Sequence, residues 1–342
     1  MLAQTRDLWE ELRGRRLFLT GGTGFFGCWL LESFLWANDK LGLGSSVTVL
    51  TRKPEAFRNK APHLAEHAAV EMLAGDVRSF EFPAGEFSHV IHAATEANAK
   101  LNDENPLLTL DTIVQGTRRA LDFAVHVGAR KFLLTSSGAV YGEQPAEMTH
   151  IPETYTGAPD STNVRSAYGE GKRAAELLCA IYHRRHGLQT KIARCFAFVG
   201  PYLPLDVHFA IGNFIRDAVG GGPIVVKGDG TPRRSYLYAT DLMTWLWTIL
   251  MKGEPCRPYN VGSEEDFTIA QVAEAVAAAA GPSCRVQAAS RPGPAAARLR
   301  YVPATRRAKE ELGLGVTYGL RQAIERTYAW NVRPAGKEEH AS

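Results

Sequence analysis

Tyr168 and Lys172 are spaced for proton transfer. They lie four residues apart in a segment of helical composition that runs to about His186, and this spacing puts the phenol and the ammonium on one helix face, one turn apart. Lowering a tyrosine pKa from about 10 towards neutrality requires roughly 4 kcal/mol of differential stabilisation. An adjacent ammonium and a cationic nicotinamide ring would supply it. The pair therefore predicts a phenolate base beside a redox cofactor.

Two hydroxyl residues precede this helix. The apolar run 131–137 predicts a buried strand that ends in Ser136 and Ser137, some thirty residues before Tyr168. Either hydroxyl could bond the same substrate oxygen from which Tyr168 takes a proton. The sequence thus predicts one site that is assembled from a strand end and a helix.

A glycine-rich turn near the start of the chain predicts where the cofactor phosphates bind. An apolar strand from Arg16 breaks at Gly21, Gly24 and Gly27 and is followed by a helix-compatible run, 28–36. Such a turn delivers a helix N-terminus to a phosphate group. Gly21 allows the turn, Gly24 lets the backbone approach a pyrophosphate, and Gly27 lets the helix pack closely on the strand.

The second predicted strand, 46–50, bears on the choice of cofactor. It is followed by Thr51-Arg52-Lys53. A dinucleotide fold that holds NAD usually has an acid at this strand tip, whereas a basic residue suits the 2′-phosphate of NADP. Arg52 therefore favours NADP over NAD, although a solvated arginine at the start of a loop explains the residue equally well. We expect NADP or NAD as the cofactor, with NADP ahead.

The remaining pattern predicts the fold class. Further strands are expected at 70–76 and 88–94, and a helix at 105–128. Strands that alternate with helices at this spacing predict an α/β fold, a Rossmann-type doubly wound parallel sheet that binds ligands at the carboxyl ends of its strands. Ala93 and Ala94 follow one such end, where their small side chains leave space for a ligand.

The second half of the chain predicts a smaller, mixed lobe, because its elements become shorter and its loops longer after about Val199. We divide the chain into a cofactor-binding domain with the Tyr168–Lys172 pair at 1–198, a mainly substrate-binding lobe at 199–335 that partly crosses back, and a tail at 336–342.

Composition excludes several classes of function. The net charge of +3 over 342 residues, without a long basic run, argues against nucleic-acid binding. Five widely separated cysteines indicate reduced thiols and no metal site. No apolar stretch reaches membrane-spanning length, and the first fifteen residues mix acidic and basic side chains. We expect a cytoplasmic protein with a small-molecule ligand and no membrane partner.

In the order of its motifs, the chain resembles the extended short-chain dehydrogenase/reductases, specifically the NAD(P)-dependent nucleotide-sugar epimerase/dehydratase branch. The resemblance runs from Leu17 to about Trp330. The features that carry it are Thr20-Gly-Gly-Thr-Gly-Phe-Phe-Gly27, Gly75-Asp76, His92-Ala-Ala94, Gly116-Thr117, Ser136-Ser-Gly-Ala-Val-Tyr-Gly142, Tyr168 with Lys172, Arg194 with Gly200-Pro201, Arg234 with Asp241, and Tyr259-Asn-Val-Gly262.

By this resemblance, Tyr168 is the catalytic base, Lys172 positions the nicotinamide ribose and lowers the pKa of Tyr168, and Ser137 is the catalytic hydroxyl. Asp76 and Val77 would flank the adenine. The implied cofactor-binding set is Gly21, Thr23, Gly24, Phe25, Phe26, Gly27, Arg52, Asp76, Val77, Ala93, Ala94, Thr95, Thr135, Tyr168 and Lys172.

The resemblance also implies a nucleotide-sugar substrate. Its diphosphate would be held in the second lobe by Arg234 and the segment 208–213, because an arginine can grip phosphate oxygens bidentately. Ala197 stands where the family usually has an asparagine, which removes one expected substrate-phosphate contact. The implied substrate-binding set is Glu96, Ser136, Ser137, Gly138, His208, Asn213, Arg234 and Arg300.

Related enzymes usually form homodimers through the helices expected at 105–128 and 168–186. We therefore expect a homodimer whose four-helix layer uses apolar residues, unless these side chains face their own sheet instead. The candidates are Leu107, Leu110, Leu177 and Ile181.

Two departures from the family pattern bear on the reaction. Sugar-nucleotide 4,6-dehydratases carry an Asp-Glu pair directly after the catalytic hydroxyl residue, because removing water needs a general acid and a general base. Related decarboxylases have a glutamate at the second position. This chain has Gly138 and Ala139 there, and neither can carry a proton.

The leading hypothesis is therefore an NAD(P)-dependent nucleotide-sugar epimerase that oxidises a sugar hydroxyl transiently to a ketone. The first alternative is an NADPH-dependent 4-ketoreductase of a nucleotide-linked deoxysugar, which would use the same residues once. A 4,6-dehydratase and a non-catalytic cofactor sensor are less well supported, the latter because Tyr168 and Lys172 are both present.

Overall fold

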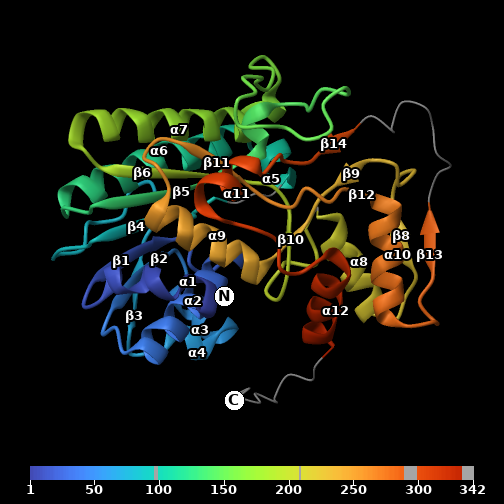
Figure 1. Cartoon of the computed structure of the whole chain (residues 1–342), viewed down its shortest axis with the longest axis horizontal. Coiled ribbons are helices and arrows are strands. Elements are labelled where there is room, and N and C mark those ends of the chain that lie inside the picture. Colours follow the sequence, from blue (N-terminus) through green and yellow to red (C-terminus); the bar gives the residue numbers. More distant parts are fainter. Residues whose placement is uncertain (96–98, 208, 289–298, 333–342) are drawn as a thin grey trace.

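Seven parallel strands form the main sheet of this protein (Figure 1). The computed structural model describes residues 1–95, 99–207, 209–288 and 299–332. Five of the strands are those predicted from the apolar runs, and the α/β, Rossmann-like fold is confirmed. In spatial order the strands are β11 (Pro258–Val261), β6 (Gln189–Cys195), β5 (Lys131–Ser137), β4 (His89–His92), β1 (Arg16–Thr20), β2 (Ser46–Thr51) and β3 (Val70–Ala74).

Helices cover both faces of this sheet (Figure 1). On one face α6 (Pro106–His126) and α7 (Ala167–His186) pack side by side, as the predicted helices 105–128 and 168–186 require. On the other face lie α2 (Phe25–Leu41) and α9 (Ala239–Lys252), whose buried side chains share one core with β1. Shorter helical pieces complete this part: α1 (Leu2–Thr5), η1 (Arg6–Leu12), α3 (Pro54–Lys60), α4 (Pro62–Ala65), α5 (Ala99–Glu104), η2 (Gly138–Tyr141), η3 (Val164–Ser166) and α11 (Arg306–Leu312).

The strand order reverses between β1 and β4, which are neighbours in the sheet. In open α/β sheets, ligands bind in the crevice outside the carboxyl ends of the strands at such a reversal. The glycine-rich turn follows β1 and Ala93 follows β4. The topology therefore brings two of the predicted binding segments to the same point.

A smaller lobe lies beyond the carboxyl ends of the strands (Figure 1). Its core joins three helices and short two- and three-stranded sheets. The chain also crosses back, because α9 and β11 pack on or extend the main sheet. The lobe contains β7 (Phe198–Val199), α8 (Ala210–Val219), β8 (Ile224–Val226), β9 (Arg233–Arg234), β10 (Leu237–Tyr238), β12 (Phe267–Thr268), α10 (Ile269–Ala280), β13 (Val286–Ala288), β14 (Arg300–Tyr301) and α12 (Leu320–Asn331).

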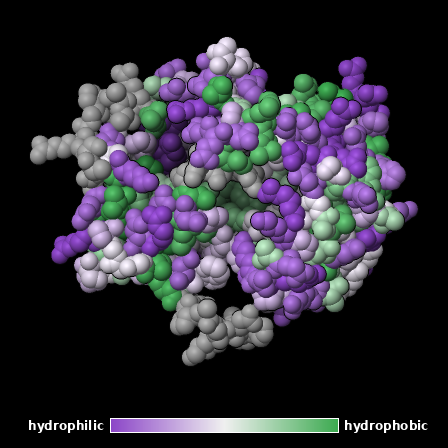
Figure 2. All heavy atoms as spheres, turned by 180° about the vertical axis from the view of Figure 1, so that it is seen from behind, coloured by the Kyte–Doolittle hydropathy of each residue, from purple (hydrophilic) through white to green (hydrophobic). Residues whose placement is uncertain are grey.

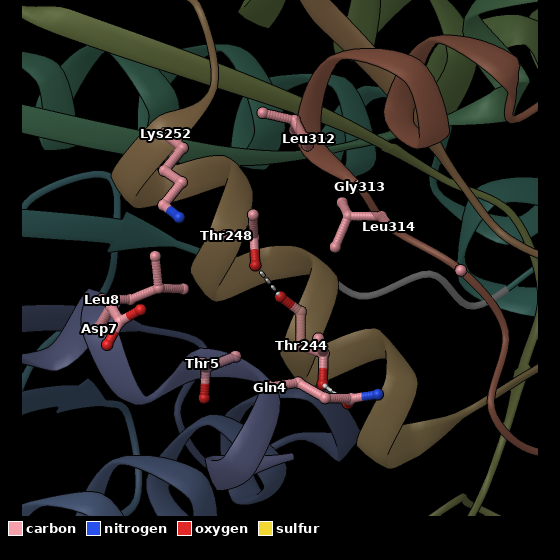
Figure 3. Close-up of a pocket in the computed structure, with 11 residues that line it drawn as sticks. Gln4, Thr5, Asp7, Leu8, Thr244, Thr248, Lys252, Leu312, Gly313 and Leu314 are labelled. Atoms are coloured by element: carbon pink, nitrogen blue, oxygen red, sulfur yellow. Dashed lines mark hydrogen bonds between the residues drawn. The ribbon is translucent and has the colours of Figure 1, made fainter.

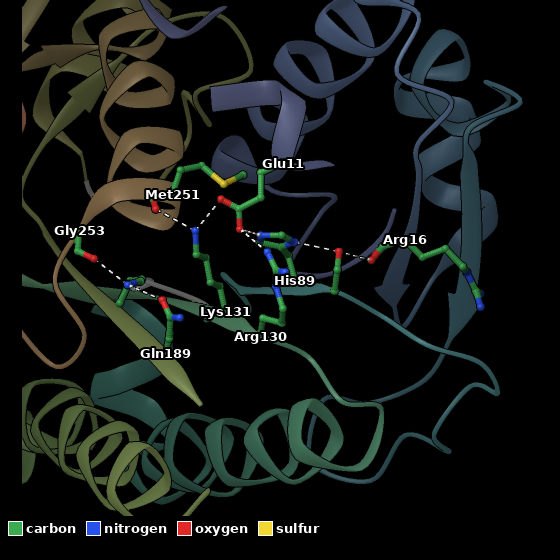
Figure 4. Close-up of polar contacts among 10 residues, drawn as sticks. Glu11, Arg16, His89, Arg130, Lys131, Gln189, Met251 and Gly253 are labelled. Carbon is green, nitrogen blue, oxygen red and sulfur yellow. Dashed lines mark hydrogen bonds and ion pairs between the residues drawn. The ribbon is translucent and has the colours of Figure 1, made fainter. Parts of the chain in front are cut away.

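A charged cluster connects the N-terminal segment to the sheet at the amino ends of its strands (Figure 4). Glu11 in η1 accepts a hydrogen bond from Lys131 Nζ at 2.7 Å and another from Arg130 at 3.1 Å. Its carboxylate also contacts His89, whose pKa burial lowers to about 4, so that this ring is neutral at pH 7. These groups lie away from the predicted site, and we assign them to stability.

The surface carries mixed side chains. Figure 2 shows hydrophilic residues with apolar ones between them, and a hollow between the part with the main sheet and the smaller lobe. Leu107 on α6 and Leu177 on α7 are 68% and 62% exposed, and Ile181 is 40% exposed, so these apolar side chains do not face their own sheet. Within the described ranges, none of the helices is both long and apolar enough to cross a membrane.

Candidate active site

The glycine-rich turn has the geometry that the sequence predicts. Gly21 has φ +73°, and a Cβ there would lie 2.5 Å from the carbonyl carbon of Ala93. A Cβ on Gly27 would lie 2.2 Å from the carbonyl carbon of Gly22, so only glycine lets α2 begin this close to β1. At Gly24, by contrast, the nearest atom to a Cβ is the Gly21 oxygen at 3.6 Å. The turn is thus closed towards the protein and open above Gly24.

The open side of the turn suits an anion. Helix α2 starts after Gly24 without a side-chain cap, so the N–H groups of its first turn are available to a phosphate. Lys60 reaches over from α3 and donates a hydrogen bond from Nζ to the Thr23 carbonyl at 2.8 Å. Phe25 and Phe26 pack below, with Phe26 edge-on against Phe198. This cradle fits the pyrophosphate of a dinucleotide.

The segments that follow β2 and β3 carry the residues predicted to face the adenosine. Arg52 is exposed at the tip of β2, and its charge contributes to lowering the pKa of Asp76. The larger cause is Arg78, which donates to both carboxylate oxygens of Asp76, at 2.9 and 3.0 Å. Val77 is buried against Gly116 of α6. The structure therefore brings Arg52 and Asp76 together, and Asp76 already has a guanidinium partner.

A buried histidine orders the end of β4. His92 contacts Thr20 Oγ1 through Nδ1 at 2.8 Å and Thr117 Oγ1 through Nε2 at 3.1 Å. Burial lowers its pKa to about 3, so the ring is neutral at pH 7. Thr20 Oγ1 also accepts the Ala94 N–H at 3.2 Å. This network fixes the Ala93-Ala94 backbone beside the glycine turn.

Lys172 is fully enclosed among the strand ends. Its Nζ donates to Thr95 Oγ1 and to the Thr135 carbonyl, each at 2.8 Å. Burial lowers the pKa of Lys172 to about 8. Thr95, Thr135 and Lys172, all predicted to bind the cofactor, therefore form one connected group.

Tyr168 lies one turn before Lys172 on α7, as predicted, but its acidity differs from the expectation. Burial raises the pKa of Tyr168 to about 12, against a smaller lowering by a hydrogen bond with Ser137. The Lys172 Nζ lies 5.9 Å from the centre of the phenol ring and is held by Thr95 and Thr135. The expected lowering of the Tyr168 pKa by Lys172 is therefore not present in the protein alone, where desolvation of the phenolate has the largest effect.

The two serines at the end of β5 have different partners. Ser137 acts on Tyr168, where its hydrogen bond opposes the rise of the pKa. Ser136 donates instead to Glu176 Oε1 at 2.5 Å, and Arg194 grips the same carboxylate, with Nη2 2.7 Å from Oε2. The hydroxyl of Ser136, a predicted substrate contact, is thus engaged by Glu176.

Three site residues carry no signal in the local sequence pattern. Tyr301 comes from β14 in the far half of the chain, and its hydroxyl lies 2.6 Å from where a Cβ on Gly138 would stand. Phe196 stacks on Tyr301 with ring centres 4.6 Å apart. Cys195 lies opposite Ser137 in the β5–β6 register, and burial raises the pKa of its thiol to about 12. Only long-range packing brings these side chains to the site.

The predicted substrate residues of the second lobe have different partners. Arg234 lies over the Tyr301 ring, with Cζ 5.8 Å from its centre. Arg300 pairs with Asp266 at 2.5 Å, and Asp266 also holds Arg233. Asn213 in α8 accepts a hydrogen bond from Arg216 at 3.3 Å. Glu96 and His208 lie outside the described residues.

The small pocket and the cysteines of the molecule are not part of the predicted site. A small polar pocket of about 150 Å³ lies between the N-terminal segment, α9 and the loop 312–315, and includes no predicted site residue (Figure 3). In the described part of the chain no three acidic, histidine or cysteine side chains are grouped to hold a metal ion. All five cysteines are free thiols, as expected.

Comparison with known proteins places this geometry in context. The model of the NAD dependent epimerase/dehydratase family matches residues 17–262. UDP-glucuronic acid decarboxylase 1 of Arabidopsis thaliana is 34% identical over 311 residues, which are 91% of this chain and 68% of that protein.

Solved structures are similar over nearly the whole chain. An epimerase from Methanothermobacter thermautotrophicus has a TM-score of 0.80 at 22% identity, over 96% of this chain and 95% of that one. UDP-glucuronic acid 4-epimerase from Bacillus cereus, in complex with UDP-glucuronic acid and NAD, has a TM-score of 0.77 at 20% identity, over 92% and 98%. At these identities, the likeness concerns the fold.

Proposed function

Because this chain belongs to the NAD-dependent epimerase/dehydratase family, we propose that it is an epimerase of a nucleotide-linked sugar and acts by transient oxidation of a sugar hydroxyl to a ketone. One observation carries the proposal. Ser137, Tyr168 and Lys172 are assembled at the strand ends, while the two positions after Ser137 hold Gly138 and Ala139, which have no ionisable group.

Each residue of the site has its own role in the proposed reaction. Tyr168 removes the proton of the sugar hydroxyl, and Ser137 bonds the same oxygen. Lys172, anchored by Thr95 and Thr135, would hold the nicotinamide ribose. When bound, the cofactor supplies a hydride acceptor and donor, and its positive ring favours the Tyr168 phenolate that burial disfavours. Arg234 and Asn213 would hold the nucleotide diphosphate. Tyr168 then returns the proton to the epimeric alkoxide.

Dehydration and decarboxylation are less well supported, although the curated relative from Arabidopsis is named a decarboxylase. Ala139 stands where such enzymes carry a glutamate. At Gly138, where dehydratases carry an aspartate, a Cβ would lie 2.6 Å from the Tyr301 hydroxyl and 2.8 Å from the Phe196 ring. The space for that acid is thus filled by two aromatic side chains.

Ketoreduction of a nucleotide-linked deoxysugar is the second candidate. It would use Ser137, Tyr168 and Lys172 once rather than twice, and would consume the reduced cofactor. Arg52 at the tip of β2 favours it, because a basic residue there suits the 2′-phosphate of NADPH. We propose NADP or NAD as the cofactor.

Product analysis tests the proposal. The cofactor that copurifies is identified by mass spectrometry of the denatured protein. The protein is then incubated with UDP-glucuronic acid, UDP-glucose and dTDP-glucose, each with NAD or NADP, and products are separated by chromatography. We expect 4-epimers, without a 4-keto-6-deoxy or pentose product.

Matched variants attribute the activity to the site. Tyr168→Phe should lower turnover by at least about a hundredfold, in line with the usual contribution of a general base, and leave cofactor affinity nearly unchanged. Tyr182→Phe removes a phenol on the same helix that bonds Asp122 and should not change turnover. Rapid dehydration or decarboxylation by the wild type would overturn the assignment as an epimerase.

A further inference from the structure

We propose that Glu176 and Arg194 are positioning residues for the reaction: their buried ion pair holds the chain on both sides of Ser137 and so fixes the catalytic hydroxyl at the end of β5. The inference rests on the proposed function, in which Ser137 bonds the substrate oxygen. It also assigns the hydroxyl of Ser136 to the support of Ser137 and not to the substrate.

The ion pair joins α7 to β6 beside the site. Glu176 lies one helical turn after Lys172 on α7, and Arg194 lies opposite Ser136 in the β5–β6 register. Arg194 donates from Nη2 to Glu176 Oε2 at 2.7 Å and from Nε to Glu176 Oε1 at 3.1 Å. The side chains of Arg194 and Glu176 are only 14% and 12% exposed. Two parallel hydrogen bonds of this kind fix the orientation of the carboxylate.

The carboxylate of the pair holds the residue before Ser137. Ser136 is buried, and its Oγ donates to Glu176 Oε1 at 2.5 Å. Hydrogen bonds to a charged acceptor are shorter and stronger than those between neutral groups. Because Ser137 follows directly in the chain, this bond limits how far the end of β5 can move away from α7.

The guanidinium of the pair holds the turn after Ser137. Ser137 is the N-cap of η2, where its Oγ accepts the Ala139 N–H at 3.1 Å. Tyr141 ends η2, and its hydroxyl accepts a hydrogen bond from Arg194 Nη1 at 2.9 Å and donates to Asn260 Oδ1 of β11 at 2.7 Å. The Arg194 guanidinium also lies over the Tyr141 ring, with Cζ 4.7 Å from its centre. Ser137 is therefore held from both of its neighbours in the chain.

Stability alone does not account for such a pair. Taking two charges out of water is unfavourable, and apolar residues of similar volume often stabilise a fold as well as a buried ion pair does. Hydrogen bonds have directions that apolar contacts lack, so the pair can fix the place of Ser136 and Tyr141 more narrowly than packing. Precision matters at this point, because a misplacement of about 1 Å can lower a rate about a hundredfold.

Two substitutions release the neighbours of Ser137 without breaking the pair. Ser136→Ala removes one hydroxyl, and Glu176 Oε1 keeps its hydrogen bond from Arg194 Nε. Tyr141→Phe keeps the ring beneath the guanidinium and removes only the phenol hydroxyl. Arg194→Lys changes the pair itself, because an ammonium keeps the charge but lacks the fork that bonds Glu176 twice and Tyr141 once.

The test measures kcat, KM and cofactor affinity for these variants. The substrate is whichever of UDP-glucuronic acid, UDP-glucose and dTDP-glucose the wild type epimerises, and calorimetry gives the Kd for NAD. Ser136→Ala and Tyr141→Phe should each lower kcat about tenfold and leave KM and Kd within about twofold of the wild type, because the positioned group acts in the chemical step. Arg194→Lys should lower kcat at least as far.

A second background shows whether the effect passes through Ser137. In Ser137→Ala, adding Ser136→Ala or Tyr141→Phe should lower kcat no further, since the hydroxyl that they position is absent. A general effect on the fold would lower kcat equally in both backgrounds.

Matched controls remove the same groups elsewhere. Ser33→Ala deletes a serine hydroxyl on α2 that is about as buried as that of Ser136. Tyr182→Phe deletes a phenol hydroxyl on α7 that bonds Asp122. Both variants should keep the kcat of the wild type.

The outcomes distinguish this inference from the proposed function. If Ser137→Ala keeps the kcat of the wild type, Ser137 is not the catalytic hydroxyl, and both proposals fail. If Ser137→Ala is slow but Ser136→Ala and Tyr141→Phe keep the kcat of the wild type, only the role of the ion pair is overturned. A raised KM at unchanged kcat in Ser136→Ala would also overturn it, because Ser136 would then contact the substrate.

Discussion

Gly24→Ala should separate cofactor binding from stability. Gly24 precedes α2 with φ −82° and ψ −174°, an extended conformation that alanine adopts without strain. A Cβ there would meet no atom closer than 3.6 Å. The added methyl group would therefore be accommodated by the protein but would stand where the turn is open to the cofactor pyrophosphate.

The expected magnitudes follow from this geometry. Alanine restricts the unfolded chain, which stabilises by about 0.4–1 kcal/mol, but it is a poorer helix N-cap than glycine by a comparable amount. The free energy of unfolding should thus stay within about 1 kcal/mol of the wild type. Loss of a single hydrogen bond to the charged phosphate costs about 1.5–3 kcal/mol, which corresponds to a roughly ten- to hundredfold weaker Kd for NAD or NADP.

Gly42→Ala is the matched control at the other end of the same helix. Gly42 has φ +57° and no atom within 4 Å of a Cβ, so alanine there should cost about 1–2 kcal/mol of stability through the left-handed backbone alone and leave cofactor affinity unchanged. Calorimetric titration with NAD and NADP and urea unfolding measure both quantities. Wild-type affinity in Gly24→Ala would refute the assignment of this turn to the pyrophosphate.

Three further predictions concern other parts of the molecule. Arg52→Ala should weaken NADP binding more than NAD binding in calorimetry, and an unaltered preference for NAD in both proteins would contradict the argument from the β2 tip. As the pH rises from about 8 to 10, the free energy of unfolding of Lys172→Met should decrease relative to that of the wild type. Burial lowers the pKa of Lys172 to about 8, so the wild type gains stability as this lysine deprotonates. Urea unfolding across that range checks the trend, and a constant difference would speak against it. The wild type should sediment as a dimer at micromolar concentration. Leu177→Glu should shift the protein towards monomer without lowering its unfolding midpoint, because Leu177 is 62% exposed. A monomeric wild type would rule out the helical interface.

The sequence by itself determined the framework of this protein. Short apolar runs predicted five of the seven strands of the main sheet. The spacing of Gly21, Gly24 and Gly27 predicted the turn, and the four-residue spacing of Tyr168 and Lys172 predicted their common helix face. These features depend on neighbours within a few residues, where backbone geometry fixes which side chains meet.

Tertiary structure decided the properties that depend on burial and on distant segments. The pKa of Tyr168 is raised to about 12 rather than lowered, because the surrounding protein removes water from the phenol. Ser136 bonds Glu176 while Ser137 interacts with Tyr168, two residues that lie eight positions apart on α7. Tyr301 reaches Gly138 across the fold. Desolvation and contacts between remote segments have no local periodicity, so the sequence pattern does not contain them, and only the packed chain brings them about.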